Sequence, residues 1–259
     1  MTQPLDAAFF AAMRASLFGG SLTQSQVNGM NAVVTAFAKY GDGDRRKLAY
    51  ALATKFHEVG PAMEPKVENL NYTSATRIRQ VWPSRFKTIA DAVPYVRAPQ
   101  KLANKVYGGR EDLGNDKPND GWTYRGRGDS QITGKANYAK FGKLLGLDLV
   151  GAPDLVLKVD VAAAILVLGL VRGLFTGRKL ADGVPDCVAA RETVNADGKA
   201  NGAKIGRYAD AFDAALRAAP VVPAAPTPAS PTSPAPTPSK TNWMAALIAA
   251  VLSLLGGKR

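Results

Sequence analysis

A proline-rich stretch near the C-terminus limits how much of this chain can fold into a core. Residues 219–239 hold eight of the 17 prolines, mixed with Ala, Thr and Ser. Such a composition cannot bury a core and favours an extended, semi-rigid spacer. The sequence therefore predicts a folded body over residues 1–218, a linker over residues 219–241 and a separate short apolar tail over residues 242–259.

The tail contains an apolar run of 13 residues, from Trp243 to Leu255. As a helix it would be about 20 Å long, which is shorter than the roughly 30 Å hydrocarbon core of a bilayer. Trp243 stands at one end, and Lys258 and Arg259 stand at the other. This arrangement suits a helix lying in a membrane interface, so we expect residues 243–259 to contact an anionic membrane. The alternative is a helix that packs on the body or self-associates.

The body has the periodicity of helices. A capping box at Thr23 and Gln26 precedes apolar residues at helical spacing, and Leu48, Leu52 and Phe56 form one stripe further on. The Gly60-Pro61 pair predicts the end of that second helix. More helices are expected over residues 74–92, 97–106 and 161–171, the last one buried, with a Gly- and Asp-rich loop over 108–130. The expected fold class is mainly α, with at most a small β-hairpin.

The net charge of the chain indicates which classes of molecule it could bind. The formal net charge is +12, with basic residues spread along the chain, and this favours nucleic acid, an anionic membrane or an acidic cell-wall polymer. Simple solubility is the alternative. No basic helix or aromatic-basic platform is visible, so we do not expect nucleic acid. With one histidine, His57, and one cysteine, Cys187, the chain offers no usual zinc site and no internal disulfide, and we expect no metal or cofactor.

Three glutamates cluster around the predicted helix end, at positions 58, 64 and 68. Glu58 lies in the last helical turn, where the helix dipole disfavours an anion and an apolar surrounding would keep the carboxyl protonated. Glu68 follows the Gly-Pro break in a segment that can fold back. One protonated and one ionised carboxyl are what cleavage of a glycosidic bond requires, although glutamates near helix ends are usually solvated.

The segment GWTYRGRGDSQITGKANY, residues 121–138, is a second candidate for function. Its glycines permit close approach to a ligand, and its Gln, Thr and Asn side chains suit sugar hydroxyls. A tight turn followed by a helix cap is the alternative. The candidate substrate-binding residues are Trp122, Tyr124, Gln131, Thr133, Asn137 and Tyr138.

Together these stretches resemble glycoside hydrolase family 19, the chitinase-like fold, and in particular the endolysins of tailed phages. HEVG (57–60) resembles the HETGG or HESGG of the family, and VENLNY (67–72) resembles the phage-type EENLNYS. YRGRGDSQITGKANY (124–138) is similar to YRGRGxxQLTGxxNY, and TVNADGKANG (193–202) looks like the INGG segment. The resemblance covers roughly residues 20–215 and implies a lysozyme-like, two-lobed helical domain with a central cleft.

The resemblance also implies roles for particular residues. Glu58 would be the general acid, Glu68 the general base, and Thr133 would hold the attacking water. The remaining implied contacts are Gln131, Asn137 and Asn195 to sugar, with His57 supporting the acid. Val59 and Pro61 depart from the HE motif, and the spacing between Glu58 and Glu68 is about one residue longer than in the phage pattern. Glu64 therefore remains an alternative base.

The expected function is hydrolysis of β-1,4 bonds of bacterial peptidoglycan with inversion, by a monomeric endolysin. A chitinase and a non-catalytic wall-binding module remain alternatives. Residues 1–20 do not read as a signal peptide, so we expect synthesis in the host cytoplasm and action on the cell wall or periplasm. An inverting mechanism would place the two carboxyls about 6.5–9.5 Å apart.

Overall fold

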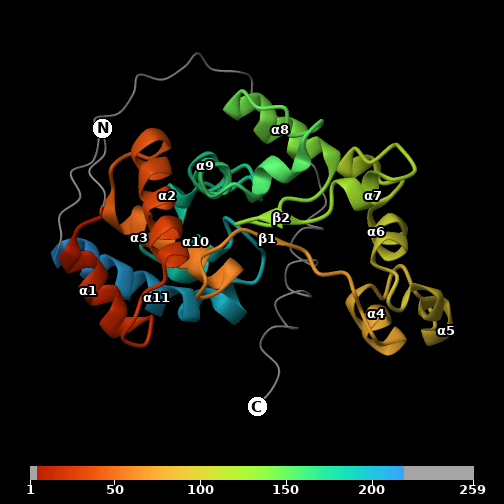
Figure 1. The fold of residues 1–259 in the computed structure, drawn as a ribbon, viewed down its shortest axis with the longest axis horizontal. Helices are drawn as coiled ribbons and strands as arrows, with labels where there is room; N and C mark the ends of the chain where they lie inside the picture. The colour runs from red at the N-terminus through yellow and green to blue at the C-terminus, as the bar shows by residue number, and fades with distance from the viewer. Residues whose placement is uncertain (1–4, 219–259) are drawn as a thin grey trace. The chain divides into compact units, whose positions relative to one another are not determined.

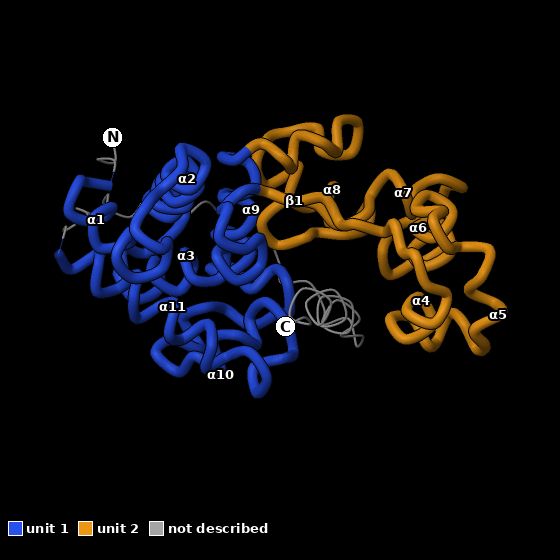
Figure 2. Tube along the Cα trace, turned by 60° about the horizontal axis from the view of Figure 1, so that its bottom comes forward, with its two compact units in different colours: residues 1–64, 159–249 blue, residues 65–158, 250–259 orange. Residues whose placement is uncertain are grey.

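The structure, a computed structural model, describes residues 5–218 (Figure 1). The predicted linker, residues 219–241, and tail, residues 242–259, lie outside the described residues. The described part is mainly helical, as expected, and divides into two compact units (Figure 2). Unit 1 holds the described residues up to Glu64 and from Val159 onward, and unit 2 holds Pro65–Lys158. Of the helices within residues 5–218, none has the length and apolar character needed to cross a bilayer.

Unit 1 is a bundle of helices formed by the two ends of the described chain. Its elements are α1 (Ala7–Ser16), α2 (Gln24–Tyr40), α3 (Arg45–Val59), α9 (Val159–Arg172), η4 (Leu180–Asp182), α10 (Cys187–Arg191) and α11 (Gly198–Ala218). Helix α11 packs along α3 and α10, and α2 packs along α9. The expected buried helix is α9, whose Leu166 and Val167 are fully buried in the core of the unit.

Local sequence signals explain where the helices of unit 1 begin and end. Thr23 and Gln26 form the predicted capping box at the start of α2. The Asp44 side chain accepts a hydrogen bond from the backbone N–H of Arg46 and so caps α3. Gly60 has a φ of 80°, a conformation that favours glycine, and it ends α3 where the sequence predicted. The last turn of α3 therefore carries His57 and Glu58.

Unit 2 consists of short elements joined by long loops. They are β1 (Lys66–Val67), α4 (Ala75–Val81), α5 (Ile89–Ala92), η1 (Val93–Tyr95), α6 (Pro99–Tyr107), η2 (Glu111–Leu113), α7 (Asp120–Thr123), β2 (Arg127–Gly128), α8 (Lys135–Leu145) and η3 (Pro153–Leu157). Strands β1 and β2 pair antiparallel, with Lys66 opposite Gly128 and Val67 opposite Arg127. The small sheet therefore joins two segments far apart in the sequence, and the strand content of residues 5–218 is as small as expected.

The helix expected over residues 74–92 is interrupted in the structure. Helix α4 ends at Val81, just before Pro83, because proline in a helix interior removes a hydrogen bond and clashes with the preceding turn. Helix α5 then begins afresh at a capping box formed by Thr88 and Asp91. The Trp82 and Phe86 rings between the two helices are buried and serve as the core of this end of unit 2.

Candidate active site

Glu58 is buried at the C-terminal end of α3, with 5% of its surface exposed. Its Oε1 accepts a hydrogen bond from Nη1 of Arg191 at 2.5 Å, and the Arg191 side chain is completely buried. The surroundings of Glu58 are therefore charged, and the apolar surroundings considered from the sequence are not found. An ion pair shielded from water is held more tightly than one on the surface, and it fixes the position of the carboxylate.

A second carboxylate holds the other side of Arg191. Asp197 accepts hydrogen bonds from Nε at 2.5 Å and from Nη2 at 3.2 Å, which is a two-pronged arrangement. Asn201 in turn donates from Nδ2 to Asp197 Oδ2 at 2.6 Å. Burial alone would lower the pKa of Arg191, but the carboxylates of Glu58 and Asp197 raise it, so the guanidinium stays charged. Four side chains from α3, α10, the segment after α10 and α11 thus form one connected network.

Two further predicted residues in unit 1 have hydrogen-bonding capacity that the described residues leave unused. Asn195 is fully buried, and neither its Nδ2 nor its Oδ1 has a partner there. The Nε2 atom of His57 is likewise buried without a partner. Burial lowers the pKa of His57 despite the neighbouring Glu58 carboxylate, so the imidazole is neutral at neutral pH. Buried polar atoms are normally paired, so these atoms are exceptions within residues 5–218.

Glu68 follows β1 in unit 2 and is also buried, with 7% of its surface exposed. Its Oε1 accepts a hydrogen bond from the Tyr107 hydroxyl at 2.6 Å, and its Oε2 accepts one from the Gly126 N–H at 3.2 Å. The Glu68 N–H donates to the Gly126 carbonyl at 2.8 Å. The β1–β2 pairing therefore brings the GRG segment against the carboxyl that the sequence singled out.

The environment of Glu68 changes its acidity. Burial raises the pKa of Glu68, and the hydrogen bonds from Tyr107 and Gly126 oppose that rise without cancelling it. Gly126 is needed for this contact, because a Cβ atom at that position would lie 3.2 Å from Glu68 Oε2. A carboxyl with a raised pKa is a better proton acceptor once ionised than an ordinary exposed glutamate.

Three predicted polar residues of the GRG segment lie close to one another beside β2. Gln131 donates from Nε2 to the carbonyls of Lys66 at 2.8 Å and Gly128 at 2.9 Å, so it ties β1 to the turn after β2. Thr133 is buried and donates its hydroxyl to the Gln131 carbonyl at 3.2 Å, and Asn137 donates to the Thr133 carbonyl at 2.7 Å. Their contacts within the chain hold the loop in place, and within residues 5–218 both acceptor lone pairs of the Thr133 hydroxyl are left unused.

The aromatic residues of the segment fall into two groups. Tyr138 is fully buried, and its hydroxyl donates to the Arg125 carbonyl and accepts from Arg127. Tyr124 is buried against it, with ring centroids 5.3 Å apart, and donates to the Val150 carbonyl. The expectation that these two rings offer faces to a sugar is therefore corrected, because both belong to the core beneath the loop.

Trp122, in contrast, is partly exposed. The guanidinium of Arg125 stacks over its ring at 3.7 Å from the centroid. The indole also lines an open pocket of about 600 Å³ together with residues of α6 and the segment before it, namely Ala98, Pro99, Gln100, Lys101 and Asn104. Among the three predicted aromatic residues, Trp122 is the one with surface available to a ligand.

The two predicted catalytic glutamates belong to different units, Glu58 to unit 1 and Glu68 to unit 2. That they face each other across a cleft stays a prediction. Glu64, the alternative base, is exposed, whereas Glu68 is buried and hydrogen-bonded. This contrast favours Glu68 as the specialised carboxyl of the pair.

The partners of the two glutamates are not apparent from their sequence motifs. Arg191 and Asp197 hold Glu58, and Tyr107 holds Glu68. Arg191 and Asp197 lie on either side of the segment VNA, residues 194–196. These two opposite charges were the sequence signal that could have indicated the partners of Glu58. No sequence signal marks Tyr107, since it reads as one more apolar position at the end of a helix.

Comparisons with known proteins agree with this picture. No family model matches the chain. A Haemophilus influenzae protein described as "Glycosyl hydrolase family 19 domain-containing protein" is 42% identical over 118 residues, which make up 46% of this chain and 58% of that protein. A rice protein (Oryza sativa subsp. japonica), "Chitinase 8", is 64% identical over 33 residues, 13% of each chain. The resemblance to glycoside hydrolase family 19 is thus confirmed, and the match spans somewhat more than half of the Haemophilus protein.

Two solved structures align with most of this chain at low sequence identity. Chitinase C from Streptomyces griseus HUT6037 is 16% identical, with a TM-score of 0.49 over 85% of this chain and 78% of that one. A bacterial family 19 chitinase is 18% identical, with a TM-score of 0.45 over 86% of this chain and 98% of that one.

Proposed function

We propose that the protein is a glycoside hydrolase that cleaves β-1,4 bonds between the aminosugars of bacterial peptidoglycan, as phage endolysins do. The observation that carries the proposal is the pair of buried glutamates, each held by its own set of hydrogen-bond donors. Buried carboxyls are rare unless they have a task, and two of them in motifs resembling one hydrolase family favour catalysis. The family named for the Haemophilus relative supports the same reaction class.

Glu58 acts as the general acid and gives its proton to the leaving glycosidic oxygen. Asp197 holds Arg191 through two N–H groups, and Glu58 uses one. The guanidinium therefore stays anchored when Glu58 becomes neutral, and it stabilises the carboxylate that forms as the proton leaves.

Glu68 acts as the general base. It removes a proton from a water molecule while the water oxygen bonds to the anomeric carbon on the face opposite the leaving group. Its raised pKa strengthens it as a base, and the Tyr107 hydroxyl fixes its orientation. Thr133 helps to orient the water through a free acceptor site, and Trp122 offers a surface for a sugar ring. One water is consumed, and solvent restores the proton of Glu58 and removes that of Glu68.

Peptidoglycan is favoured as the substrate by the excess of positive charge and by the ENLNY motif, which resembles the phage type. Chitin is the second candidate, because 33 residues match the rice "Chitinase 8". We further propose a monomer that is made in the host cytoplasm and acts on the cell wall, with residues 243–259 contacting an anionic membrane. Removing residues 240–259 should weaken binding to anionic liposomes. Unchanged binding without the tail would contradict its role.

The test of the proposed function is mass spectrometry of fragments released from purified peptidoglycan, beside an assay on colloidal chitin. We expect disaccharide-based fragments from peptidoglycan, and loss of their release in Glu58→Gln and Glu68→Gln. Glu64→Gln is the matched control, because Glu64 is exposed, and it should keep activity near that of the wild type. Release from chitin alone would reassign the substrate. Binding to sacculi without any release would leave a wall-binding module.

A further inference from the structure

The net positive charge of the described chain is concentrated in one segment of unit 2, because that segment has few acidic residues. Residues 75–110, called the basic segment below, contain eight lysines and arginines and one acidic residue, Asp91. The rest of unit 2 carries eight basic and eight acidic residues, and the described part of unit 1 carries 14 and 12. The basic segment therefore has a net charge of +7, which accounts for most of the net positive charge of residues 5–218. Helices α4 and α6 carry two of these cations each, the other four lie outside the helices, and α5 carries the acid.

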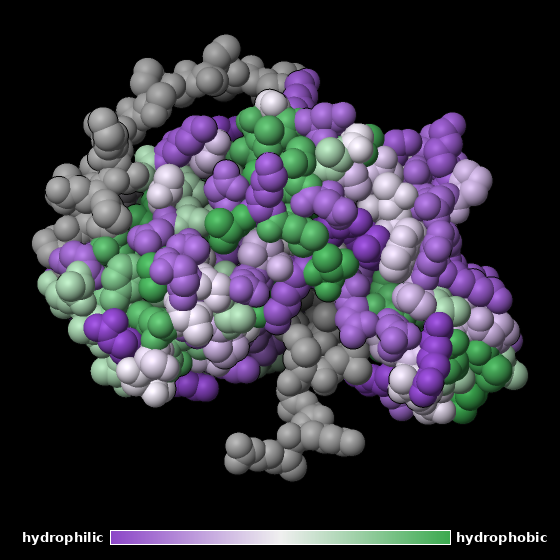
Figure 3. Space-filling view, in the orientation of Figure 1, coloured by the Kyte–Doolittle hydropathy of each residue, from purple (hydrophilic) through white to green (hydrophobic). Residues whose placement is uncertain are grey.

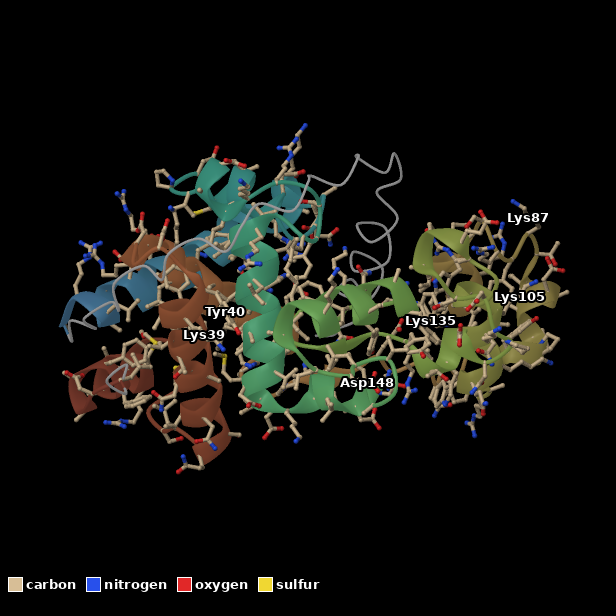
Figure 4. All side chains as sticks on the ribbon, turned by 90° about the horizontal axis from the view of Figure 1, so that it is seen from above. Lys39, Tyr40, Lys87, Lys105, Lys135 and Asp148 are labelled. Carbon is tan, nitrogen blue, oxygen red and sulfur yellow. The ribbon has the colours of Figure 1, made fainter. Side chains whose placement is uncertain are left out.

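The cations of the basic segment are turned to solvent. Six are exposed and, within residues 5–218, form no ion pair: Arg79, Arg85, Lys87, Arg97, Lys101 and Lys105. Figure 4 shows Lys87 and Lys105 at the α4–α6 end of unit 2. The single acid, Asp91, accepts a hydrogen bond from the Thr88 N–H at the start of α5, so its position serves the helix cap. Like charges left unpaired this close together repel one another, and an anionic partner relieves that repulsion.

Two large aliphatic side chains interrupt this charged surface. Ile89 is 48% exposed and Val93 is 58% exposed, although Phe86 and Ala92 beside them are buried in the core. The spacing of four residues places Ile89 and Val93 on one side of the α5–η1 turn. Figure 3 shows hydrophobic surface, in green, bordered by hydrophilic purple at this end of unit 2.

We propose that the basic segment docks on the surface of a bilayer containing anionic phospholipid, with Ile89 and Val93 entering the interface and the surrounding cations contacting the headgroups. Cations flanking a small exposed apolar patch are the arrangement by which peripheral proteins bind such surfaces. A hydrophilic polyanion would satisfy the cations but would give the aliphatic side chains nothing to be buried in. The apolar pair therefore selects the lipid. This docking does not depend on the proposed hydrolase activity.

The experiment uses the full chain with a polarity-sensitive dye on a single cysteine. In a Cys187→Ser background, the dye is attached at Val93→Cys or, as the control, at Val188→Cys, because Val188 is 40% exposed in α10 of unit 1. Each protein is mixed with phosphatidylglycerol vesicles or phosphatidylcholine vesicles. We expect a blue shift for the dye at position 93 with phosphatidylglycerol alone, and none at position 188.

Charge reversal provides the second arm. The variant Arg85→Glu, Lys87→Glu, Lys105→Glu should bind phosphatidylglycerol vesicles at least about 10-fold more weakly, since each basic residue near an anionic surface contributes favourably. The matched control, Arg172→Glu, Arg178→Glu, Lys199→Glu, reverses three exposed cations of unit 1 and should leave the dye shift in place. Circular dichroism checks that both triple variants are folded.

Three results would overturn the proposal. The first is vesicle binding without a shift at position 93, which would assign the contact to another part of the chain, such as residues 243–259. The second is an equal loss of the shift in both triple variants, which would indicate general charge attraction. The third is the same shift at position 93 with dextran sulfate and no lipid, which would make the partner a polyanionic polymer.

Discussion

At the scale of single residues, the two candidate catalytic carboxyls are held in opposite ways. Glu58 is paired with a buried guanidinium, whereas the hydrogen-bond donors to Glu68 within residues 5–218 are neutral, namely the Tyr107 hydroxyl and the Gly126 N–H. The sequence identified both positions through their motifs, but it could not identify the partners. Arg191 lies 133 positions from Glu58, and Tyr107 lies 39 positions from Glu68. Such contacts depend on packing between distant segments, which local patterns do not encode.

The buried Glu68 should make the protein less stable as the pH rises. Because the pKa of Glu68 is raised in the folded state, its contribution to stability is full below its ordinary pKa of 4.5 and is lost as the pH rises through the folded value. Glu68→Gln cannot ionise, so its stability relative to wild type should improve from pH 4 to pH 8, while activity falls by about 10²–10⁴-fold. Urea unfolding at several pH values measures this. A constant difference across that range would contradict the assigned burial of charge.

Tyr107→Phe should shift the acidic limb of the activity profile to higher pH. The substitution removes the hydroxyl that stabilises the ionised Glu68, so the pKa of Glu68 rises further and more alkali is needed to generate the base. The profile of kcat/KM against pH reports this, with activity at alkaline pH largely kept. Tyr95→Phe is the control, since Tyr95 lies in the same unit and its ring stacks with Lys101 without needing the hydroxyl. A uniform loss at every pH would indicate a purely structural role for Tyr107.

At the scale of elements, the sequence predicted α2, α3 and α9 but set no bounds for α11, which is the longest helix within residues 5–218. The capping box at Thr23 and the stop at Gly60 are local signals. Helix α2 begins at the first signal, and helix α3 ends at the second. The helix expected over residues 74–92 is broken because Pro83 overrides the surrounding pattern. The β1–β2 pairing could not be predicted, since two-residue strands carry no alternation and their pairing joins distant segments.

The attachment of α3 to α10 should depend on the ion pair between Glu58 and Arg191. Breaking a buried pair leaves a charge without its partner and typically costs about 3–5 kcal/mol. Glu58→Gln and Arg191→Met should each destabilise the protein. The loss of unfolding free energy in the double variant should be smaller than the sum of the losses in the two single variants, by at least about 1 kcal/mol. Urea unfolding of all four proteins measures this coupling.

The control for this cycle is the pair between Lys47 and Asp42, in which the Asp42 side chain is exposed and the Lys47 side chain is partly buried, and Lys47→Met should cost less than about 1 kcal/mol. Additive effects of Glu58→Gln and Arg191→Met would show that the pair does not hold the two helices together. A large cost for Lys47→Met would show that the assay does not separate buried from exposed pairs.

At the scale of the whole molecule, the residues with proposed roles are distributed over both units. Glu58 and its network belong to unit 1, while Glu68, Thr133 and Trp122 belong to unit 2. An inverting hydrolase uses an acid and a base on opposite faces of one sugar ring. A water molecule has to fit between the base and the anomeric carbon, and that requirement sets the stereochemistry of the product.

The product of the first turnovers should therefore have the inverted, α configuration at the anomeric carbon. Inversion requires carboxyls about 6.5–9.5 Å apart, whereas a retaining enzyme needs them about 5–5.5 Å apart, close enough for one of them to attack the sugar directly. Proton NMR of a soluble glycan oligomer, recorded within the first minutes, distinguishes the two anomers before they equilibrate in water. Glu68→Gln is the informative control: if Glu68 activates a water, added azide should restore turnover by entering the space that water occupies. An initial β product from the wild type would exclude the roles assigned to Glu58 and Glu68 together, because no arrangement with water between base and sugar retains configuration in a single displacement.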